Sequence, residues 1–547
     1  MASKWQDIAW EKQHFLLDTL PSEYRISKSQ IPPDTQLDVT TFPQASGLFS
    51  PEELEITSSD ATELLTKIHN GQWTSVAVTK AFIHRACVAH QLTNCLSETL
   101  FKTALARAAE LDTHLKETGK PIGPLHGLPI SLKDNFQLPG VASSLGFTSW
   151  ANEPSTSTSI LPQLLLSLGA IHYVKTNVPT AMMIAETVNN TFGRTTNPLN
   201  RGTTSGGSSG GESALITMHA SPLGVGTDIG GSLRIPAACT GIYTLRPSFG
   251  RFPTGGARSG LAGQEAVNSV NGPMARSIAS LEVFAKAVVG AQPWLYDPKC
   301  VPIPWRSVSV PQKMKIAVLE CDGMVMPTPP VRRALRETVK KLQAAGHEIV
   351  SWDPRLHKAL NQCLTVFFTA DGGETLKSIL KQTGEPFRPE MAAYDSAKAL
   401  SVQEYWGVQA KRTTLATELL KQWRELGCDC LLLPTMPYAT VQNGHFRHVA
   451  YTGVFNIVDW SAVSFPTGMK VDKDVDQETE KWETMSEDDA YVRDHCELTC
   501  FDDHETILTR LDDASKVHNM PISLQLVAQR FEEEKVIEMM KRVVEVL

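Results

Sequence analysis

The spacing of hydrophobic residues along the chain switches between the helical period and the strand period. Segments with helical spacing or helix-forming composition alternate with short apolar segments that are typical of buried strands. Helices are expected over 4–18, 97–118, 158–168, 331–345 and 531–547. Strands are expected over 130–133, 170–175, 315–319, 347–351 and 520–527. This alternation predicts an α/β fold in which a mixed or parallel sheet has helices on both faces.

Capping residues predict where some of these helices begin and end. Ser50 is placed as an N-cap because Pro51 follows it at the first helical position. Thr74 is placed as the N-cap of a further helix. Gly119 is expected to stop the alanine- and leucine-rich helix over 97–118.

Composition narrows the class of protein. The chain has 547 residues, of which 42% are hydrophobic, an ordinary fraction for a soluble globular protein. Its formal charge of −8 disfavours a nucleic-acid partner, which normally requires a basic surface. The ten cysteines do not follow the spacing of a disulfide framework. The first 21 residues lack the apolar core of a signal peptide. The apolar run near 161–174 is interrupted by polar residues, as a membrane-spanning helix would not be. We therefore expect a cytoplasmic protein without a membrane span, and a homodimer is left open.

A dense run of Asp and Glu sets the segment 471–515 apart from the rest of the chain. Such a run is expected to be a solvated surface insertion. The segment also holds His495, Cys496, Cys500 and His504, but their spacing is loose for zinc and a second close cysteine pair is missing. Neither a metal nor an organic cofactor is therefore expected.

Two glycine-rich clusters around serines lie within 202–236. The first is Gly206-Gly207-Ser208-Ser209-Gly210-Gly211, and the second is Gly226-Thr227-Asp228-Ile229-Gly230-Gly231-Ser232. Clustered glycines indicate a backbone that bends unusually or approaches another group closely. In the second cluster successive N–H groups can converge beside the last hydroxyl, which is the arrangement that an oxyanion hole requires.

Several kinds of chemistry compete for these serines. Gly206-x-Ser208-x-Gly210 fits the nucleophile elbow of α/β-hydrolases, but residues 195–202 look like a loop where that elbow needs a strand. A phosphate-binding loop would need Gly-Lys-Ser/Thr or G-x-G-x-x-G, which neither cluster has. A Ser-His-Asp scheme with His126 or His219 lacks an acidic partner, and structural roles for both histidines are favoured. The remaining hypothesis pairs the serines with a lysine.

Lys133 ends the expected strand 130–133, and that stretch alone favours a solvated lysine at a sheet edge. Serine needs a base to remove its proton, and a lysine can be that base only when it is neutral. Burial can lower a lysine pKa from about 10.4 to about 7–8, which corresponds to roughly 4 kcal/mol. Ser-Lys dyads are a recognised variant of the serine triad. The hypothesis therefore requires a buried Lys133.

These motifs resemble the amidase signature family. The matching segments are 129–134, 175–179, 192–198, 206–212 and 226–236. The resemblance covers nearly the whole chain and is closest to fungal acetamidases, as segments 91–95, 186–190 and 302–306 also indicate. It implies one amidase domain over 1–547, with a catalytic core at about 120–260 and the acidic insertion at about 471–515. It also implies a single large mixed twisted β-sheet covered by α-helices on both faces.

The resemblance implies a role for each residue of the motifs. Ser232 would be the nucleophile, Ser208 the bridging serine after a cis peptide bond, and Lys133 the base. The oxyanion hole would be made by the backbone N–H groups of Ile229, Gly230, Gly231 and Ser232. Supporting roles would fall to Ser209, Asp228 and Arg234. Met182 and Ser208 would contact the substrate, although a methionine is more often core filler.

The function that the resemblance implies is hydrolysis of a carboxylic acid amide to a carboxylate and ammonia or an amine, through an acyl-enzyme. The alternative is a transamidase subunit that delivers ammonia to charged tRNA, which the net negative charge disfavours. The expected partner is a small-molecule amide, with no nucleic acid and no membrane. The motifs do not select among acetamide, fatty, aryl and lactam substrates, or esters.

Overall fold

The computed structural model describes residues 4–477, 482–495 and 514–547. Its centre is an 11-stranded sheet in the order β1-β3-β2-β8-β10-β9-β14-β15-β13-β11-β12. In chain order the strands of this sheet are β1 (Leu96–Thr99), β2 (Pro129–Lys133), β3 (Ile171–Thr176), β8 (Leu223–Asp228), β9 (Tyr243–Arg246), β10 (Val270–Ala275), β11 (Lys315–Val318), β12 (Glu348–Ser351), β13 (Cys430–Pro434), β14 (Ala462–Lys470) and β15 (Pro521–Val527).

The sheet is mixed, as predicted. β2 pairs in parallel with both β3 and β8, and β11 pairs in parallel with β12 and β13. From β8 through β10, β9, β14 and β15 to β13, neighbouring strands are antiparallel. Each parallel pair needs a long crossover connection, which explains the helices between these strands.

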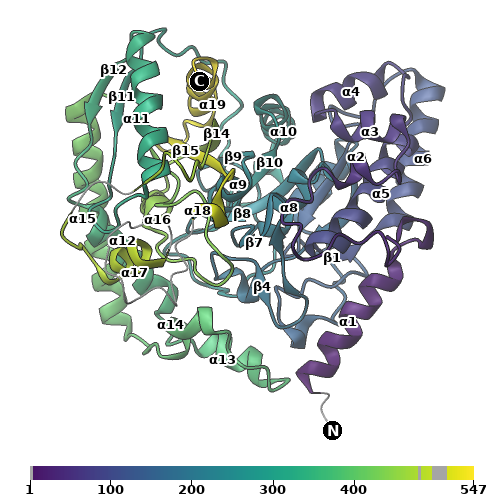
Figure 1. Cartoon of the computed structure of the whole chain (residues 1–547), viewed down its shortest axis with the longest axis horizontal. Coiled ribbons are helices and arrows are strands. Elements are labelled where there is room, and N and C mark those ends of the chain that lie inside the picture. The colour runs from purple at the N-terminus through teal and green to yellow at the C-terminus, as the bar shows by residue number, and fades with distance from the viewer. Residues whose placement is uncertain (1–3, 478–481, 496–513) are drawn as a thin grey trace.

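Helices flank the sheet along its whole length (Figure 1). The N-terminal helices gather at one end of the molecule, and α11, α12 and α15 gather at the other (Figure 1). The helices are α1 (Trp5–Thr19), α2 (Phe42–Ala45), α3 (Pro51–Ser58), α4 (Ala61–His69), α5 (Ser75–Thr93), α6 (Phe101–Thr118), α7 (Ile160–Ser167), α8 (Gly210–Thr217), α9 (Arg234–Thr240), α10 (Ile278–Gly290), α11 (Pro329–Ala344), α12 (His357–Thr369), α13 (Glu374–Lys381), α14 (Ala392–Asp395), α15 (Val402–Leu426), α16 (Ala450–Ile457), α17 (Glu487–His495), α18 (Ala514–Val517) and α19 (Glu533–Glu545). Among the described residues, none of these helices is both long and apolar enough to cross a membrane.

The predicted caps are confirmed. Ser50 caps α3 in a capping box with Glu53, and Thr74 accepts a hydrogen bond from Ala77 N at the start of α5. Gly119 ends α6 in the left-handed conformation, with φ of +66°. Each cap satisfies backbone groups that the helix itself leaves unpaired.

Two predictions about local structure are wrong. The segment expected to be helical from residue 97 begins as β1, and α6 starts only at Phe101, because Leu96–Thr99 pairs with β3. This tertiary pairing overrides the helix-forming composition. The segment 195–202, expected to be a loop, holds the short strands β6 (Thr196–Asn197) and β7 (Asn200–Thr204), which pair with each other outside the main sheet.

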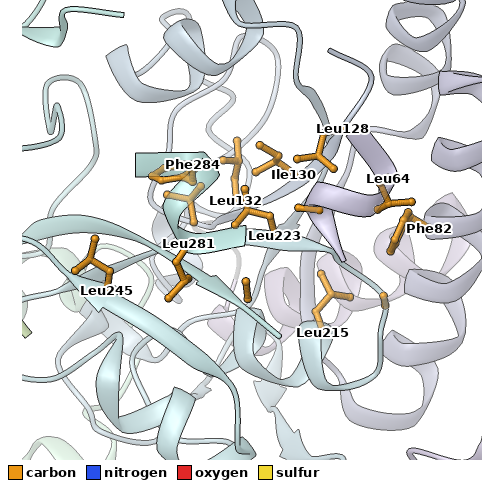
Figure 2. Packing of buried hydrophobic residues seen from close by; sticks show 14 of the residues in the cluster. Leu64, Phe82, Leu128, Ile130, Leu132, Leu215, Leu223, Leu245, Leu281 and Phe284 are labelled. Carbon is orange, nitrogen blue, oxygen red and sulfur yellow. The ribbon is translucent and has the colours of Figure 1, made fainter. Parts of the chain in front are cut away.

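The alternation of residues in β2 separates the core from the site. Ile130 and Leu132 lie in the main hydrophobic cluster, together with Leu223 of the neighbouring strand and Phe284 of α10 (Figure 2). Successive side chains of a strand point to opposite faces, so Ser131 and Lys133 point the other way. The strand therefore anchors one face in the core and presents polar groups on the other.

The acidic segment is not solvated throughout. Within its described part, Asp476 and Asp489 are each only 2% exposed. Asp476 accepts hydrogen bonds from Arg333 Nε at 2.6 Å and from Arg333 Nη2 at 2.8 Å. Cys496, Cys500 and His504 lie outside the described residues, so the zinc alternative stays untested there. The described residues contain no group of three His, Cys, Asp or Glu side chains placed to hold a metal ion.

Candidate active site

Lys133 points into the interior of the protein. Its side chain is fully buried, and its Nζ donates hydrogen bonds to Ser208 Oγ at 2.8 Å and to Thr227 Oγ1 at 2.7 Å. The prediction of a solvated lysine at a sheet edge, made from the strand alone, is therefore wrong. The reason is topological: β2 lies between β3 and β8, inside the sheet and not at its edge.

Burial changes the protonation of this lysine. It lowers the pKa of Lys133 from its ordinary value of 10.5 to about 7, although the carboxyl groups of Asp228 and Glu212 act in the opposite direction. Burial also raises the pKa of Glu212 to about 7, while Ser131 and Thr176 donate hydrogen bonds to it. At neutral pH a substantial fraction of Lys133 is neutral and able to accept a proton.

Ser208 lies in a tightly packed turn at the start of α8. The Gly207–Ser208 peptide bond is cis. A Cβ on Gly207 would lie 2.6 Å from the carbonyl carbon of Ala185, and a Cβ on Gly206 would lie 2.5 Å from Pro236 Cα. Close contacts with other backbone segments therefore explain why the first cluster is rich in glycine.

Ser232 lies two residues before α9 and lines a cavity of about 110 Å³. Gly207, the residue before Ser208, lines the same cavity, which we call the Ser232 cavity. Among the hydrogen bonds of the described residues, none joins Ser232 to Ser208. The structure thus brings Lys133 and Ser208 into direct contact and leaves the Ser232 hydroxyl without a hydrogen bond in the described part of the chain.

The turn before α9 provides backbone donors. Gly231 has φ of +133°, which favours glycine, and its N–H donates to Asp228 Oδ1 at 2.8 Å. The place of the Gly231 amide in an oxyanion hole stays a prediction. The amides of Ile229, Gly230 and Ser232 donate no hydrogen bond to any described residue, and all three residues line the Ser232 cavity.

Asp228 and Arg234 form a fully buried ion pair beside this turn. Arg234 Nε lies 3.1 Å from Asp228 Oδ2, and both side chains are completely buried. Burial alone would raise the pKa of Asp228, but Arg234 lowers it to about 2. Arg234 also donates to Asn456 Oδ1 at 2.6 Å and to Gln525 Oε1 at 3.1 Å. These contacts fix the carboxylate that holds the Gly231 amide, in line with a supporting role.

Ser209 and Met182 lie close to the same residues. Ser209 Oγ donates to the Thr227 carbonyl and accepts from the Thr227 amide, each at 3.3 Å, so it ties the first glycine cluster to β8. Met182 lines the Ser232 cavity together with Phe368 of α12 and Tyr394 of α14. The cavity lining is mostly apolar. Met182 therefore contacts the cavity and is also part of a hydrophobic cluster.

Three residues of the site were not singled out from the sequence. Thr227 is the second acceptor of the lysine, and α16 contributes Thr452 and Asn456. Thr452 Oγ1 donates to the Gly230 carbonyl at 2.7 Å, and Asn456 Nδ2 donates to Asp228 Oδ1 at 2.7 Å. Thr227 lies inside the second glycine-rich cluster, so the sequence alone could have pointed to it. Helix α16 is more than 200 residues away in the chain, and no local pattern indicates the contact.

The two histidines near the motifs have structural surroundings. His219 Nδ1 lies 2.9 Å from Arg276 Nη1, and burial together with Arg276 lowers the pKa of His219 to about 3. His126 Nδ1 accepts a hydrogen bond from Ile122 N at 3.0 Å, and burial lowers its pKa to about 4. These contacts support the structural roles that were favoured for both.

Known proteins resemble the chain over nearly its whole length. A family model described as Amidase matches residues 77–537. An acetamidase of Emericella nidulans is 37% identical, covering 98% of this chain and 97% of the relative. The putative amidase kk1C of Curvularia clavata is 39% identical, covering 99% of this chain and 98% of the relative. A solved structure of a fatty acid amide hydrolase matches with a TM-score of 0.92 at 34% identity, covering 99% of this chain and 95% of that one.

Proposed function

Because this chain belongs to the amidase family and is an amide-bond hydrolase, we propose that it works through Ser232, Ser208 and Lys133 and forms an acyl-enzyme. The observation that carries the proposal is the contact between Lys133 and Ser208. A buried lysine with a lowered pKa, 2.8 Å from a serine hydroxyl, is the base that serine chemistry needs.

The proposed mechanism starts with neutral Lys133. It takes a proton from Ser208 as Ser208 takes one from Ser232, and the Ser232 oxygen attacks the amide carbonyl. The resulting oxyanion accepts hydrogen bonds from the amides of Ile229, Gly230 and Ser232. The relay then returns a proton to the nitrogen as the carbon–nitrogen bond breaks, which releases ammonia or an amine. Water, deprotonated by the same relay, cleaves the ester on Ser232 and releases the carboxylate.

The size of the Ser232 cavity supports a short acyl group. An apolar cavity of about 150 Å³ can hold one benzene molecule. The Ser232 cavity, at about 110 Å³, is smaller, and its lining includes Met182, Ile235, Phe368 and Val449. We therefore propose aliphatic amides of a few carbons as substrates, which agrees with the acetamidase name of one relative.

The transamidase alternative stays a prediction, and the relatives described above are named acetamidase, amidase and amide hydrolase. Ammonia release from acetamide by the purified single chain would favour the proposed function. Activity that appears only with added partner subunits would favour the alternative. The proposed chemistry uses no metal or organic cofactor.

Covalent labelling tests which serine is the nucleophile. A fluorophosphonate probe should attach to Ser232, as mapped by mass spectrometry of the digested protein. Ser232→Ala should lose both the label and turnover, by roughly 10³-fold or more. Labelling of Ser208 in the wild type would contradict the proposed order of the relay and would revive the nucleophile-elbow hypothesis.

A further inference from the structure

Helix α17, from the acidic segment, is bonded to the loop that follows β11. Asp489 is 2% exposed and accepts a hydrogen bond from Met326 N at 2.8 Å. Ser486 Oγ, just before the helix, donates to the Met324 carbonyl at 2.7 Å. Val492 is 2% exposed and lies in one hydrophobic cluster with Ile235, a residue of the Ser232 cavity. A solvated insertion would not be expected to make these buried contacts.

His448 connects this helix to the interior. Its Nε2 lies 2.5 Å from Asp322 Oδ2, and its Nδ1 lies 3.6 Å from Asp488 Oδ2 of α17. The imidazole is only 4% exposed. Burial would lower the pKa of His448, but the two carboxylates raise it to about 9, so the ring is a cation at neutral pH. Asp322 is itself fixed, because it accepts hydrogen bonds from the amides of Met324 and Val325.

The residues that follow His448 in the chain line the Ser232 cavity or contact its lining. Val449 lines the cavity and is the N-cap of α16. Thr452, in the first turn of α16, holds the Gly230 carbonyl at 2.7 Å. His448 itself has φ of +66°, which is uncommon for a residue other than glycine, and ion pairs with two carboxylates hold its ring.

We propose that Asp488 of α17 and Asp322 hold His448 and thereby place Val449 against the substrate acyl group. His448 is then a positioning residue, since it acts through Val449 and α16 and does not touch the substrate. The inference rests on the proposed function, because that function assigns the acyl group to the Ser232 cavity. It gives the acidic segment a role that a solvated insertion would lack.

Matched charge removals on α17 test the proposal. Asp488→Asn removes the carboxylate that faces His448. Glu487→Gln removes the neighbouring charge, which is exposed and makes no hydrogen bond or ion pair within the described residues. We expect Asp488→Asn to raise KM for acetamide and butyramide by about tenfold, because its ion pair with a buried imidazolium is lost, with kcat within about twofold. Glu487→Gln should leave both constants unchanged.

The separate changes in kcat and KM distinguish a positioning role from a loss of folded protein. A variant that merely loses folded protein has fewer active sites, so its apparent kcat falls while KM stays constant. That result, or unchanged constants in Asp488→Asn, would overturn the proposal. His448→Gln should change KM in the same direction and further. If the wild type hydrolysed no amide, the proposed function would fail by itself. The rate of labelling by a short-chain fluorophosphonate would still compare the two α17 variants, with a tenfold decrease expected for Asp488→Asn and none for Glu487→Gln.

Discussion

Replacing Lys133 with methionine tests whether a buried, neutral lysine drives the reaction. Methionine has a similar length and flexibility but cannot carry a proton. The fall of the Lys133 pKa from 10.5 to about 7 corresponds to about 5 kcal/mol, at about 1.4 kcal/mol per pKa unit. This is the free energy by which the folded protein disfavours the ammonium form. The side chain is fully buried, so solvent screening does not reduce the figure.

The sign of the stability effect follows from where each state releases the proton. The unfolded chain keeps the Lys133 proton up to about pH 10.5, whereas the folded protein releases it near pH 7. Between these values the unfolded state binds more protons, so the free energy of unfolding rises with pH, by about 1.4 kcal/mol per pH unit. The Lys133→Met variant lacks this contribution. The difference between wild type and variant should therefore change by about 3 kcal/mol over two pH units in this window.

Two measurements check the prediction. Urea unfolding of both proteins at several pH values gives the stability difference, in which the contributions of ionisable groups that do not interact with Lys133 cancel. Amide hydrolysis by the wild type should have a kcat/KM that falls about tenfold per pH unit below pH 7, because protonated Lys133 cannot accept a proton. Lys133→Met should lose turnover by roughly 10²–10⁴-fold. Lys80→Met, a change of an exposed lysine on α5, serves as the control and should alter neither property.

Two results would refute the reasoning. A wild-type kcat/KM that stays flat from pH 5 to pH 9 would mean that no group with a pKa near 7 controls the reaction. A stability difference between wild type and Lys133→Met that does not vary with pH would mean that the lysine is not desolvated. The second result would remove the base from the proposed mechanism even if the variant were inactive.

Three further changes give distinct outcomes. Phe368 lines both the Ser232 cavity and an adjoining cavity of about 280 Å³, so Phe368→Ala should raise kcat/KM for hexanamide relative to acetamide at least tenfold, measured by ammonia release. A Cβ at Gly231 would lie 2.2 Å from Thr452 Oγ1, so Gly231→Ala should lower kcat by about 10²–10³-fold in the same assay. Labelling by the fluorophosphonate would give the number of folded active sites in this variant. Lys12 forms a buried ion pair with Glu98, so Lys12→Met should lower the free energy of unfolding in urea by about 3 kcal/mol. Adding Glu98→Gln to this variant should restore most of that loss.

The motifs singled out residues that the structure brings together, but they did not indicate the surroundings of those residues. Lys133, Ser208 and the cis bond before Ser208 were reached through the resemblance, and the structure joins Lys133 to Ser208. The burial of the lysine was not predictable from 130–133 alone, because a strand's position in a sheet depends on pairing with distant segments. The same limit explains β1, where pairing with β3 replaced an expected helix.

Contacts between distant segments account for the other differences. The acidic composition of 471–515 correctly marks charge, but it does not indicate that Asp489 is buried or that Asp488 faces His448. Likewise, the glycine cluster and the resemblance placed the Gly231 amide among the oxyanion donors, which stays a prediction. They did not indicate that this N–H donates to Asp228, whose carboxylate is fixed by Arg234.

A lysine beside two carboxyl groups would ordinarily be expected to stay charged, and the structure explains why Lys133 does not. Asp228 is ionised, but Arg234 pairs with it at 3.1 Å and offsets its charge. Glu212 is buried without a partner cation in direct contact among the described residues, and burial raises its pKa to about 7, so it is only partly ionised at neutral pH. Both groups that would favour the ammonium are thus weakened by different means. Desolvation then dominates, which leaves Lys133 able to accept a proton at the pH where Glu212 begins to lose one.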